Sequence, residues 1–298
     1  MKEYPCYLCG AQSFAVIDAQ DGPDTYLAII APELQRGARA LAACAECGFV
    51  QHVPKLEPAE IDTLYRHFRD HSLTTETPDQ YFDRITALPP GQSENQDKIE
   101  WLAPRLVERF GPRGPRSALD IGCGGGVFLW SLRRRFPDAE LMGVEPTTQF
   151  AALAARRLGI PVVAEGFDSK RIGRRFEAVF LNQVLEHVFD PVAFLADIAR
   201  VMEARSVLYA EVPDVADLGY LAPDHDRFMA QHLHVFSAPA LKEVLRRAGL
   251  RTIAEDAAVT VRGKRNLLVL AERGTAPEQS WRVAADEVRA LRRAFHGQ

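Results

Sequence analysis

Residues 117–136, SALDIGCGGGVFLWSLRRRF, decide the fold class of this chain. The apolar run before the glycines predicts a buried β-strand, and the residues after them predict a helix. Between the two, Gly122, Gly124 and Gly126 occupy alternate positions. Glycine is needed where the backbone takes positive φ or where a ligand packs against the main chain, and a helix N-terminus offers free N–H groups to an anion. The stretch therefore predicts the first strand–turn–helix unit of an α/β domain that binds a ligand.

A second predicted strand, AELMGV, runs directly into Glu145. An acidic side chain at the end of the second strand accepts hydrogen bonds from a ribose diol in nucleotide-binding α/β folds. A dinucleotide-binding turn has glycine or alanine where this chain has Val127, which disfavours a dehydrogenase. The ligand predicted here therefore contains a ribose, and a nicotinamide dinucleotide is the disfavoured alternative.

The pattern LDIGCGGG followed by VEP resembles the first two motifs of class I S-adenosylmethionine-dependent methyltransferases. The resemblance implies an α/β fold with a Rossmann-like seven-stranded sheet, over residues 101–272. Its later strands are expected within IPVVAEGF, FEAVFLN, SVLYAEVP, RTIAEDAAV and NLLVLAERG. The family pattern also implies S-adenosylmethionine as cofactor. By resemblance, the cofactor-binding residues are Asp120, Gly122, Gly124 and Gly126 at the methionine end, Glu145 at the ribose, Phe167 near the adenine, and Asn182 and Gln183 near the donor group.

Four of the five cysteines form two Cys-x-x-Cys pairs, CYLCG and CAECG. Two residues between thiolates allow one tight turn to present both sulfurs to a tetrahedral ion. The sequence therefore predicts a structural zinc ion, with no open coordination position, in a ribbon-like module over residues 1–56; disulfides and a redox pair are the disfavoured alternatives. The predicted zinc ligands are Cys6, Cys9, Cys44 and Cys47. His52 is an alternative ligand or, preferably, a surface or interface histidine.

The remaining segments are predicted from their turn residues and apolar spacing. Residues 10–43 alternate short apolar runs, including YLAII, with turn residues, and predict two or three short strands. Residues 57–100 predict helices on the substrate side, with Ser93 capping a helix that ends at Gly111. Residues 273–298 predict a C-terminal helix.

Histidines near the expected acceptor site supply the candidate catalytic groups, because histidine titrates near neutral pH. The segment before Phe236-Ser237 resembles that of sugar C-methyltransferases, whose His-Glu-His becomes Ala230-Gln231-His232 here. Gln231 cannot take a proton, and we expect the chain to lack the further C-terminal domain of those enzymes, so both features disfavour carbon methylation. Quinone-type O-methyltransferases carry Glu-x-x-Glu-His where this chain has Gln183-Val-Leu-Glu186-His187, and the missing acid disfavours a metal there. The candidate bases are His232 first, then His187 and His225.

Composition restricts the partners. The formal net charge is -4 and the pI near 6.1, so nucleic acid is not an expected partner. No apolar run reaches the roughly 18 residues of a membrane span, and the N-terminus has no secretory layout, so we expect a cytoplasmic protein. The predicted function is methyl transfer to a small-molecule acceptor (a sugar, nucleotide sugar or secondary metabolite), with oxygen or nitrogen favoured over carbon. The alternatives are an RNA methyltransferase whose zinc module binds the nucleic acid, and a non-catalytic scaffold; the oligomeric state stays open.

Overall fold

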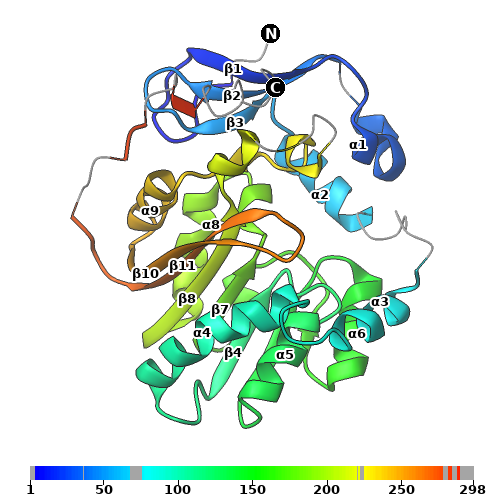
Figure 1. Ribbon diagram of the computed structural model, residues 1–298, viewed down its shortest axis with the longest axis vertical. Coiled ribbons are helices and arrows are strands. Elements are labelled where there is room, and N and C mark those ends of the chain that lie inside the picture. Colours follow the sequence, from blue (N-terminus) through cyan, green and yellow to red (C-terminus); the bar gives the residue numbers. More distant parts are fainter. Residues whose placement is uncertain are drawn as a thin grey trace.

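The computed structural model describes residues 4–35, 37–67, 76–219, 221, 225–277, 281–283 and 287–288. The described chain forms two sheets (Figure 1), a four-stranded one in the order β1-β2-β3-β9 and a seven-stranded one in the order β10-β11-β8-β7-β4-β5-β6. The predicted Rossmann-like seven-stranded sheet is therefore confirmed.

The large sheet has five parallel strands and an antiparallel hairpin at one edge. Its strands are β4 (Ser117–Ile121), β5 (Glu140–Val144), β6 (Val162–Val163), β7 (Phe176–Asn182), β8 (Met202–Pro213), β10 (Leu250–Val259) and β11 (Arg265–Arg273). Each lies where the sequence predicted it. The strand order reverses at β4, where crossovers leave in both directions, and ligands bind open α/β sheets at such a point, beyond the carboxyl ends of the strands.

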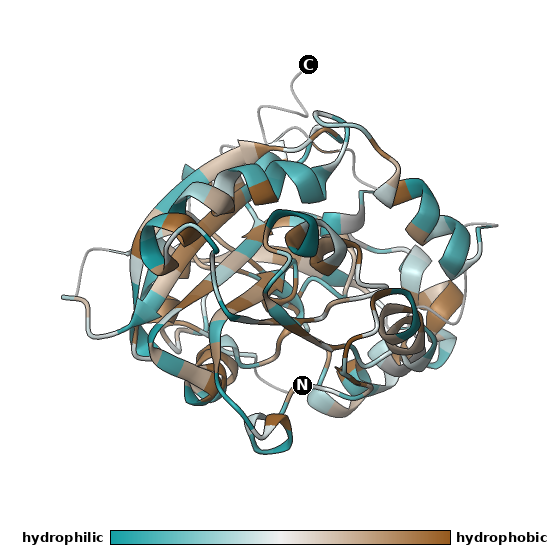
Figure 2. Cartoon of the chain, turned by 90° about the horizontal axis from the view of Figure 1, so that it is seen from below, coloured by the Kyte–Doolittle hydropathy of each residue, from teal (hydrophilic) through white to brown (hydrophobic). Residues whose placement is uncertain are grey.

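Helices cover both faces of this sheet. On one face the apolar sides of α3 (Pro78–Thr86), α4 (Glu94–Phe110), α5 (Val127–Arg135) and α6 (Thr148–Leu158) share a core with β4 and β8. On the other face lie α7 (Ser169–Ile172), α8 (Pro191–Ile198) and α9 (Ala238–Arg247). In Figure 2 the outward sides of the helices are largely hydrophilic, whereas apolar residues gather on the strands between them. This distribution is what a sheet buried on both faces requires.

The helix caps confirm the predicted bounds of α4. The Ser93 hydroxyl accepts a hydrogen bond from Gln96 N at 3.4 Å, and Gly111 ends the helix with φ 91°. Within the described chain, no helix is both long and apolar enough to cross a bilayer.

The N-terminal sheet contains β1 (Phe14–Gln20), β2 (Arg39–Cys44) and β3 (Val50–Val53), and it gains a fourth strand from the α/β domain. That strand, β9 (His234–Val235), pairs antiparallel with β3. Residue 52 donates its backbone N–H to Leu233 O at 3.1 Å, which extends the contact into the loop that carries His232. The module predicted for residues 1–56 is therefore joined by hydrogen bonds to the segment beside the site.

The prediction of a strand at YLAII is wrong. These residues lie in helix α1 (Thr25–Ile30), because Asp24 caps it by accepting from Tyr26 N and Leu27 N, each at 2.9 Å. The helix buries Leu27 and Ile30 against the loop that precedes β9. An N-cap and an amphipathic contact thus override the β propensity of this run.

The predicted C-terminal helix lies mostly outside the described residues. Of the described part, Trp281–Val283 is irregular and residues 287–288 are helical, and both pieces pack against the N-terminal module. Val283 N donates to Cys47 O at 3.1 Å, and a Cβ at Gly48 would lie 2.3 Å from Val283 O. The segment after the last strand therefore contacts the cysteine module.

Two buried histidines, His52 and His234, lie on the β3–β9 strand pair. Burial lowers their pKa values to about 4 and about 3. His52 is 1% exposed and lies outside the cysteine group, so the expectation of a surface histidine or zinc ligand is wrong and that of an interface histidine holds. His234 packs among aromatic rings, with centroids 5.2 Å from Tyr7 and 5.4 Å from Phe49.

These histidines predict a pH dependence of stability. Their folded pKa values lie below the unfolded value of about 6.5, so their contribution is present above that pH and is lost as pH falls toward 4. When the pH falls from 7 to 5, each of the two histidines is expected to lower the free energy of unfolding by about 2 kcal/mol. Urea unfolding at both pH values checks this, with the double variant His52→Leu, His234→Phe expected to lose less stability on acidification than the wild type. Equal losses in both proteins would contradict the assignment.

Candidate functional site

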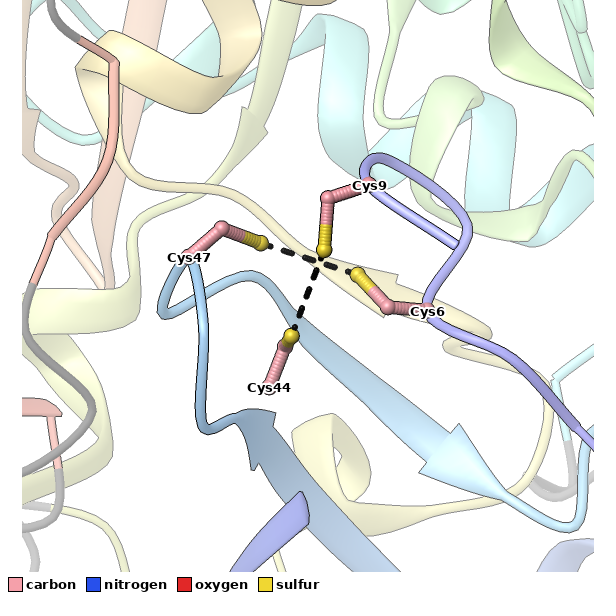
Figure 3. Close-up of side chains that lie close together, drawn as sticks. All are labelled: Cys6, Cys9, Cys44 and Cys47. Atoms are coloured by element: carbon pink, nitrogen blue, oxygen red, sulfur yellow. Dashed lines mark hydrogen bonds between the residues drawn. The ribbon is translucent and has the colours of Figure 1, made fainter. Parts of the chain in front are cut away.

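The four paired cysteines converge on one point (Figure 3). Cys6 Sγ lies 3.6 Å from Cys47 Sγ, and Cys9 Sγ lies 3.5 Å from Cys44 Sγ. All four sulfurs lie within 4.8 Å of one another. With metal–sulfur bonds of about 2.3 Å, the sulfurs of a tetrahedral zinc site stand about 3.8 Å apart. The observed spacing fits such a site, and none of these thiols forms a disulfide.

Backbone amides in the two cysteine turns stabilise sulfur in its anionic form. The hydrogen bond shared by Cys6 and Cys47 lowers the pKa of Cys6 and raises that of Cys47, and the N–H groups of Leu8 and Cys9 donate to Cys6 Sγ and lower its pKa further. Each turn closes with a glycine N–H donating to the carbonyl of the first cysteine at 2.8 Å, and the two glycines, Gly10 and Gly48, have φ of 78° and 72°. Glycine takes this left-handed backbone without a steric cost, which lets each turn close tightly around its cysteines.

The glycine turn after β4 leaves room for a ligand at one position. Gly122, Gly124 and Gly126 all have positive φ, at 75°, 51° and 86°. A Cβ at Gly122 would lie 2.6 Å from Val184, and one at Gly126 would lie 2.7 Å from Leu158. At Gly124, in contrast, no atom of the described chain would lie within 4 Å. The outer two glycines permit close packing, and the middle one faces open space.

Glu145 lies beside this turn at the end of β5 and braces it. Its Oε2 accepts from Gly124 N at 2.9 Å, and its Oε1 accepts from Thr147 N at 2.9 Å. The side chain is 7% exposed. A carboxylate held this way keeps further lone pairs on both oxygens, which suits a ribose diol.

Asp120 and Asn182 meet where β4 and β7 end. Asn182 Nδ2 donates to Asp120 Oδ1 at 3.1 Å. Burial raises the pKa of Asp120 to about 7, an effect that the Asn182 hydrogen bond opposes. Asn182 Oδ1 is buried and accepts no hydrogen bond from any described residue. A buried acceptor without a donor costs about 1–3 kcal/mol, so this oxygen has capacity for a ligand donor.

Two further predicted cofactor residues are Gln183, whose backbone is strained, and Phe167. Gln183 has φ 55°, while its backbone N–H is fixed by Glu211 O at 2.9 Å. Left-handed backbone outside glycine is uncommon and concentrates at functional positions. Phe167 is half-buried and stacks edge-on against Phe194, with centroids 5.7 Å apart.

Beyond Gln183, a carboxyl group and two histidines gather. Glu186 and His187 lie in the short 3₁₀ turn Leu185–His187, and His232 comes from the loop before β9. The ligand atoms of the three lie within 4.8 Å of one another, and the rings of His187 and His232 have centroids 4.8 Å apart. Glu186 is fully buried, and burial raises its pKa to about 8. The structure thus brings two of the three candidate bases together.

The third candidate base, His225, stands outside this cluster. Its Nδ1 accepts from Arg227 N at 3.2 Å within its own loop, and it is not a member of the group formed by the other two histidines.

Segments from the N-terminal part of the chain surround the cluster. The Tyr65 ring, on α2 (Pro58–His67), meets His187 edge-on with centroids 5.5 Å apart. Asp24 Oδ2 accepts from Ala230 N at 2.7 Å and so holds the loop that carries His232. Next to the cysteine turn, Tyr7 Oη donates to Asp190 at 2.6 Å, directly after the Glu186 turn. The arrangement fits a site walled by the N-terminal segments.

A family model described as a methyltransferase domain matches residues 92–255, more than half of the chain. The chain belongs to this methyltransferase-domain family.

Individual relatives match over part of their length. The trans-aconitate 2-methyltransferase of Acidovorax sp. strain JS42 is 29% identical over 116 residues, or 39% of this chain and 45% of that protein. The tRNA U34 carboxymethyltransferase of Hydrogenovibrio crunogenus is 28% identical over 169 residues, or 52% of this chain and 50% of that protein. The chain therefore spans about half the length of the curated relatives it matches.

Among solved structures, this methyltransferase-domain chain resembles the 1,6-didemethyltoxoflavin-N1-methyltransferase of Burkholderia thailandensis. The TM-score is 0.52 at 19% identity, over 80% of this chain and 96% of that one. The likeness shows that the two share the fold of S-adenosylmethionine-dependent methyltransferases.

Sequence reasoning missed a buried charged network beside the site of this methyltransferase domain. Lys98 Nζ, from α4, lies 2.7 Å from Glu211 Oε2, and Asn266 Nδ2 donates to Glu211 Oε1 at 2.6 Å. Arg227, 2% exposed, donates to Asn266 Oδ1 at 2.6 Å and pairs with Asp217 at 3.1 Å. An acid inside the apolar strand SVLYAEVP was the available sequence signal, because buried charges need partners.

Proposed function

We propose that this protein transfers a methyl group from S-adenosylmethionine to an oxygen or nitrogen atom of a small-molecule acceptor. The observation that carries the proposal is the glycine turn, open at Gly124 and braced by Glu145, at the switch point of the sheet. Membership of the methyltransferase-domain family supports the reaction type.

The residues around the turn are suited to hold this cofactor. The backbone from Gly122 to Gly126 and the start of α5 would receive its methionine portion, and Glu145 would accept from the ribose hydroxyls. Phe167 would contact the adenine, while Asn182 and Gln183 would lie beside the donor group. When bound, the cofactor supplies a methyl group on a positively charged sulfur, already activated toward displacement.

On the acceptor side, the protein's task is chiefly to align the nucleophile with the methyl carbon. The attacking atom forms its bond to carbon as the carbon–sulfur bond breaks, and one proton leaves the acceptor. His232 is the proposed group that receives this proton, with His187 beside it. His225 remains a weaker candidate, because the structure does not join it to the cluster.

A sugar, nucleotide sugar or secondary metabolite is the proposed acceptor. The walls formed by α2, the loop before β9 and the N-terminal module favour a small acceptor, and so do the names of two similar proteins, which act on trans-aconitate and didemethyltoxoflavin. One relative's name refers to tRNA, so RNA is the alternative acceptor. The net charge of -4 gives it less support, because RNA binding draws on clustered positive charge.

The cysteine module is proposed to hold a structural zinc ion. Four converging sulfurs close the coordination sphere and leave no position for a substrate.

Replacing His232 with alanine is predicted to lower turnover about 100-fold or more while changing S-adenosylhomocysteine affinity by less than about threefold. A positioned base acts on the transition state, whereas cofactor binding does not use it. The measurement is labelled methyl transfer to whichever sugar, nucleotide sugar or hydroxylated metabolite the wild type methylates, with calorimetry for the affinity. Normal turnover in the variant would remove His232 from the mechanism.

A further inference from the structure

Glu186 is a fully buried carboxyl group whose two oxygens accept no hydrogen bond from any described residue. Arg227 of the polar network pairs with Asp217 and Asn266, and it donates no hydrogen bond to the Glu186 oxygens. Likewise Lys98 is paired with Glu211. An orphaned buried carboxyl group is costly and calls for a partner that the described chain does not supply.

The orientation of His187 points to the nature of that partner. His187 Nδ1 lies 2.8 Å from Gln231 O, and since a carbonyl accepts only, Nδ1 carries the proton and donates it. The other ring nitrogen, Nε2, therefore carries a lone pair, and it faces Glu186 Oε1 at 3.9 Å. Histidines that bind a metal usually donate the N–H of their other ring nitrogen to a backbone carbonyl or a carboxylate, as His187 does with its Nδ1.

His232 completes a set of three ligands. One ring nitrogen of His232, one of His187 and a Glu186 oxygen form a group in which all ligand atoms lie within 4.8 Å of one another. Atoms that bind one cation at about 2.1 Å each lie no more than about 4.2 Å apart, so a small shift of side chains would suffice. Two imidazoles and one carboxylate form a ligand set used for first-row divalent metals, with coordination positions left open on one side.

We propose that Glu186, His187 and His232 bind a divalent cation that holds the acceptor through two neighbouring oxygen atoms. This inference rests on the proposed function and names its substrate class: a vicinal diol, a hydroxy acid or a hydroxyketone, all of which chelate a cation with open positions. The site follows the end of β7, next to Asn182 and Gln183.

The reaction balances without a further reactant. In this arrangement His232 binds the cation in place of receiving the acceptor proton. The cation lowers the pKa of the acceptor hydroxyl, which then loses its proton to water. The oxygen lone pair forms the bond to the methyl carbon, and the carbon–sulfur bond breaks with its electrons going to sulfur. The products are a methyl ether or ester, S-adenosylhomocysteine and a proton.

The test uses Mn²⁺ as the probe with full-length protein whose cysteine site is loaded with zinc. Electron paramagnetic resonance is expected to show the free Mn²⁺ signal falling as one ion binds per chain, with nitrogen coupling from imidazole. Glu186→Gln is expected to weaken this binding about tenfold or more. The matched control Glu203→Gln, an exposed acid near the start of β8, should bind like the wild type.

Each outcome decides a separate claim. Absence of Mn²⁺ binding, binding without nitrogen coupling, or equal binding by Glu186→Gln would overturn the cation site. If Glu186→Gln does not fold, His232→Gln carries the same comparison, because loss of a loop ligand leaves the buried Glu186 in place. S-adenosylhomocysteine is titrated into the same samples: its binding without Mn²⁺ binding sinks the cation site alone, whereas its failure to bind sinks the proposed function and the cation's role with it.

Discussion

Replacing Glu145 with alanine is expected to weaken S-adenosylhomocysteine binding about 100-fold or more. Two hydrogen bonds from the ribose hydroxyls to a carboxylate would be lost, each worth about 1.5–3 kcal/mol. The variant also removes the acceptor for Gly124 N, so the open turn loses the brace that fixes its shape. Calorimetric titration of both proteins measures the effect.

A surface acid on the same strand supplies the control for this experiment. Glu140 begins β5, and its side chain is 69% exposed in an ion pair with Arg174. Glu140→Ala should bind S-adenosylhomocysteine like the wild type, because an exposed ion pair contributes little. Equal affinity in Glu145→Ala and Glu140→Ala would show that Glu145 does not hold the cofactor.

Replacing Cys44 with serine is expected to abolish zinc binding and lower the melting temperature by about 10 °C or more. Binding of a structural zinc ion contributes several kcal/mol to folding, and about 2–4 °C accompanies each kcal/mol in chains of this order of size. The loss of stability should extend to the methyltransferase domain, because β3 pairs with β9 and Tyr7 donates a hydrogen bond to Asp190. Zinc content by elemental analysis and thermal unfolding measure the two effects.

The fifth cysteine is the matched control. Cys123 is buried in the glycine turn, away from the four converging sulfurs. Cys123→Ser should therefore keep one zinc ion per chain. Full zinc content in Cys44→Ser, or loss of zinc in Cys123→Ser, would contradict the proposed four-cysteine site.

Local patterns predicted most of the fold. The central strands β4, β7 and β8 are apolar runs that are largely buried, so their sequence signal is strong. The strand prediction for YLAII was wrong because the conformation of this run depends on two things. One is the cap formed by Asp24, and the other is burial against Ala230 and Leu233, which are distant in the sequence. Pairing of β3 with β9 was likewise invisible, since it joins residues nearly two hundred positions apart.

The candidate site was predictable where function constrains the main chain. The glycine turn and Glu145 have fixed spacing, and the structure places them together. The acceptor side depends on tertiary contacts: the sequence ranked His232 before His187 and His225, whereas the structure places His187 with His232 and separates His225 from both. The sequence also disfavoured a metal beside Glu186 because one acid of a familiar motif is missing, yet it could not show that His232 comes within reach of that carboxylate. A cytoplasmic location stays a prediction.

Calorimetric titration of the zinc-loaded wild-type protein with S-adenosylhomocysteine tests the central claim most directly. Binding of one molecule per chain at about micromolar affinity or tighter, some 8 kcal/mol or more, is the predicted result. Folded, zinc-loaded protein that does not bind S-adenosylhomocysteine would contradict the account of the glycine turn as a cofactor site.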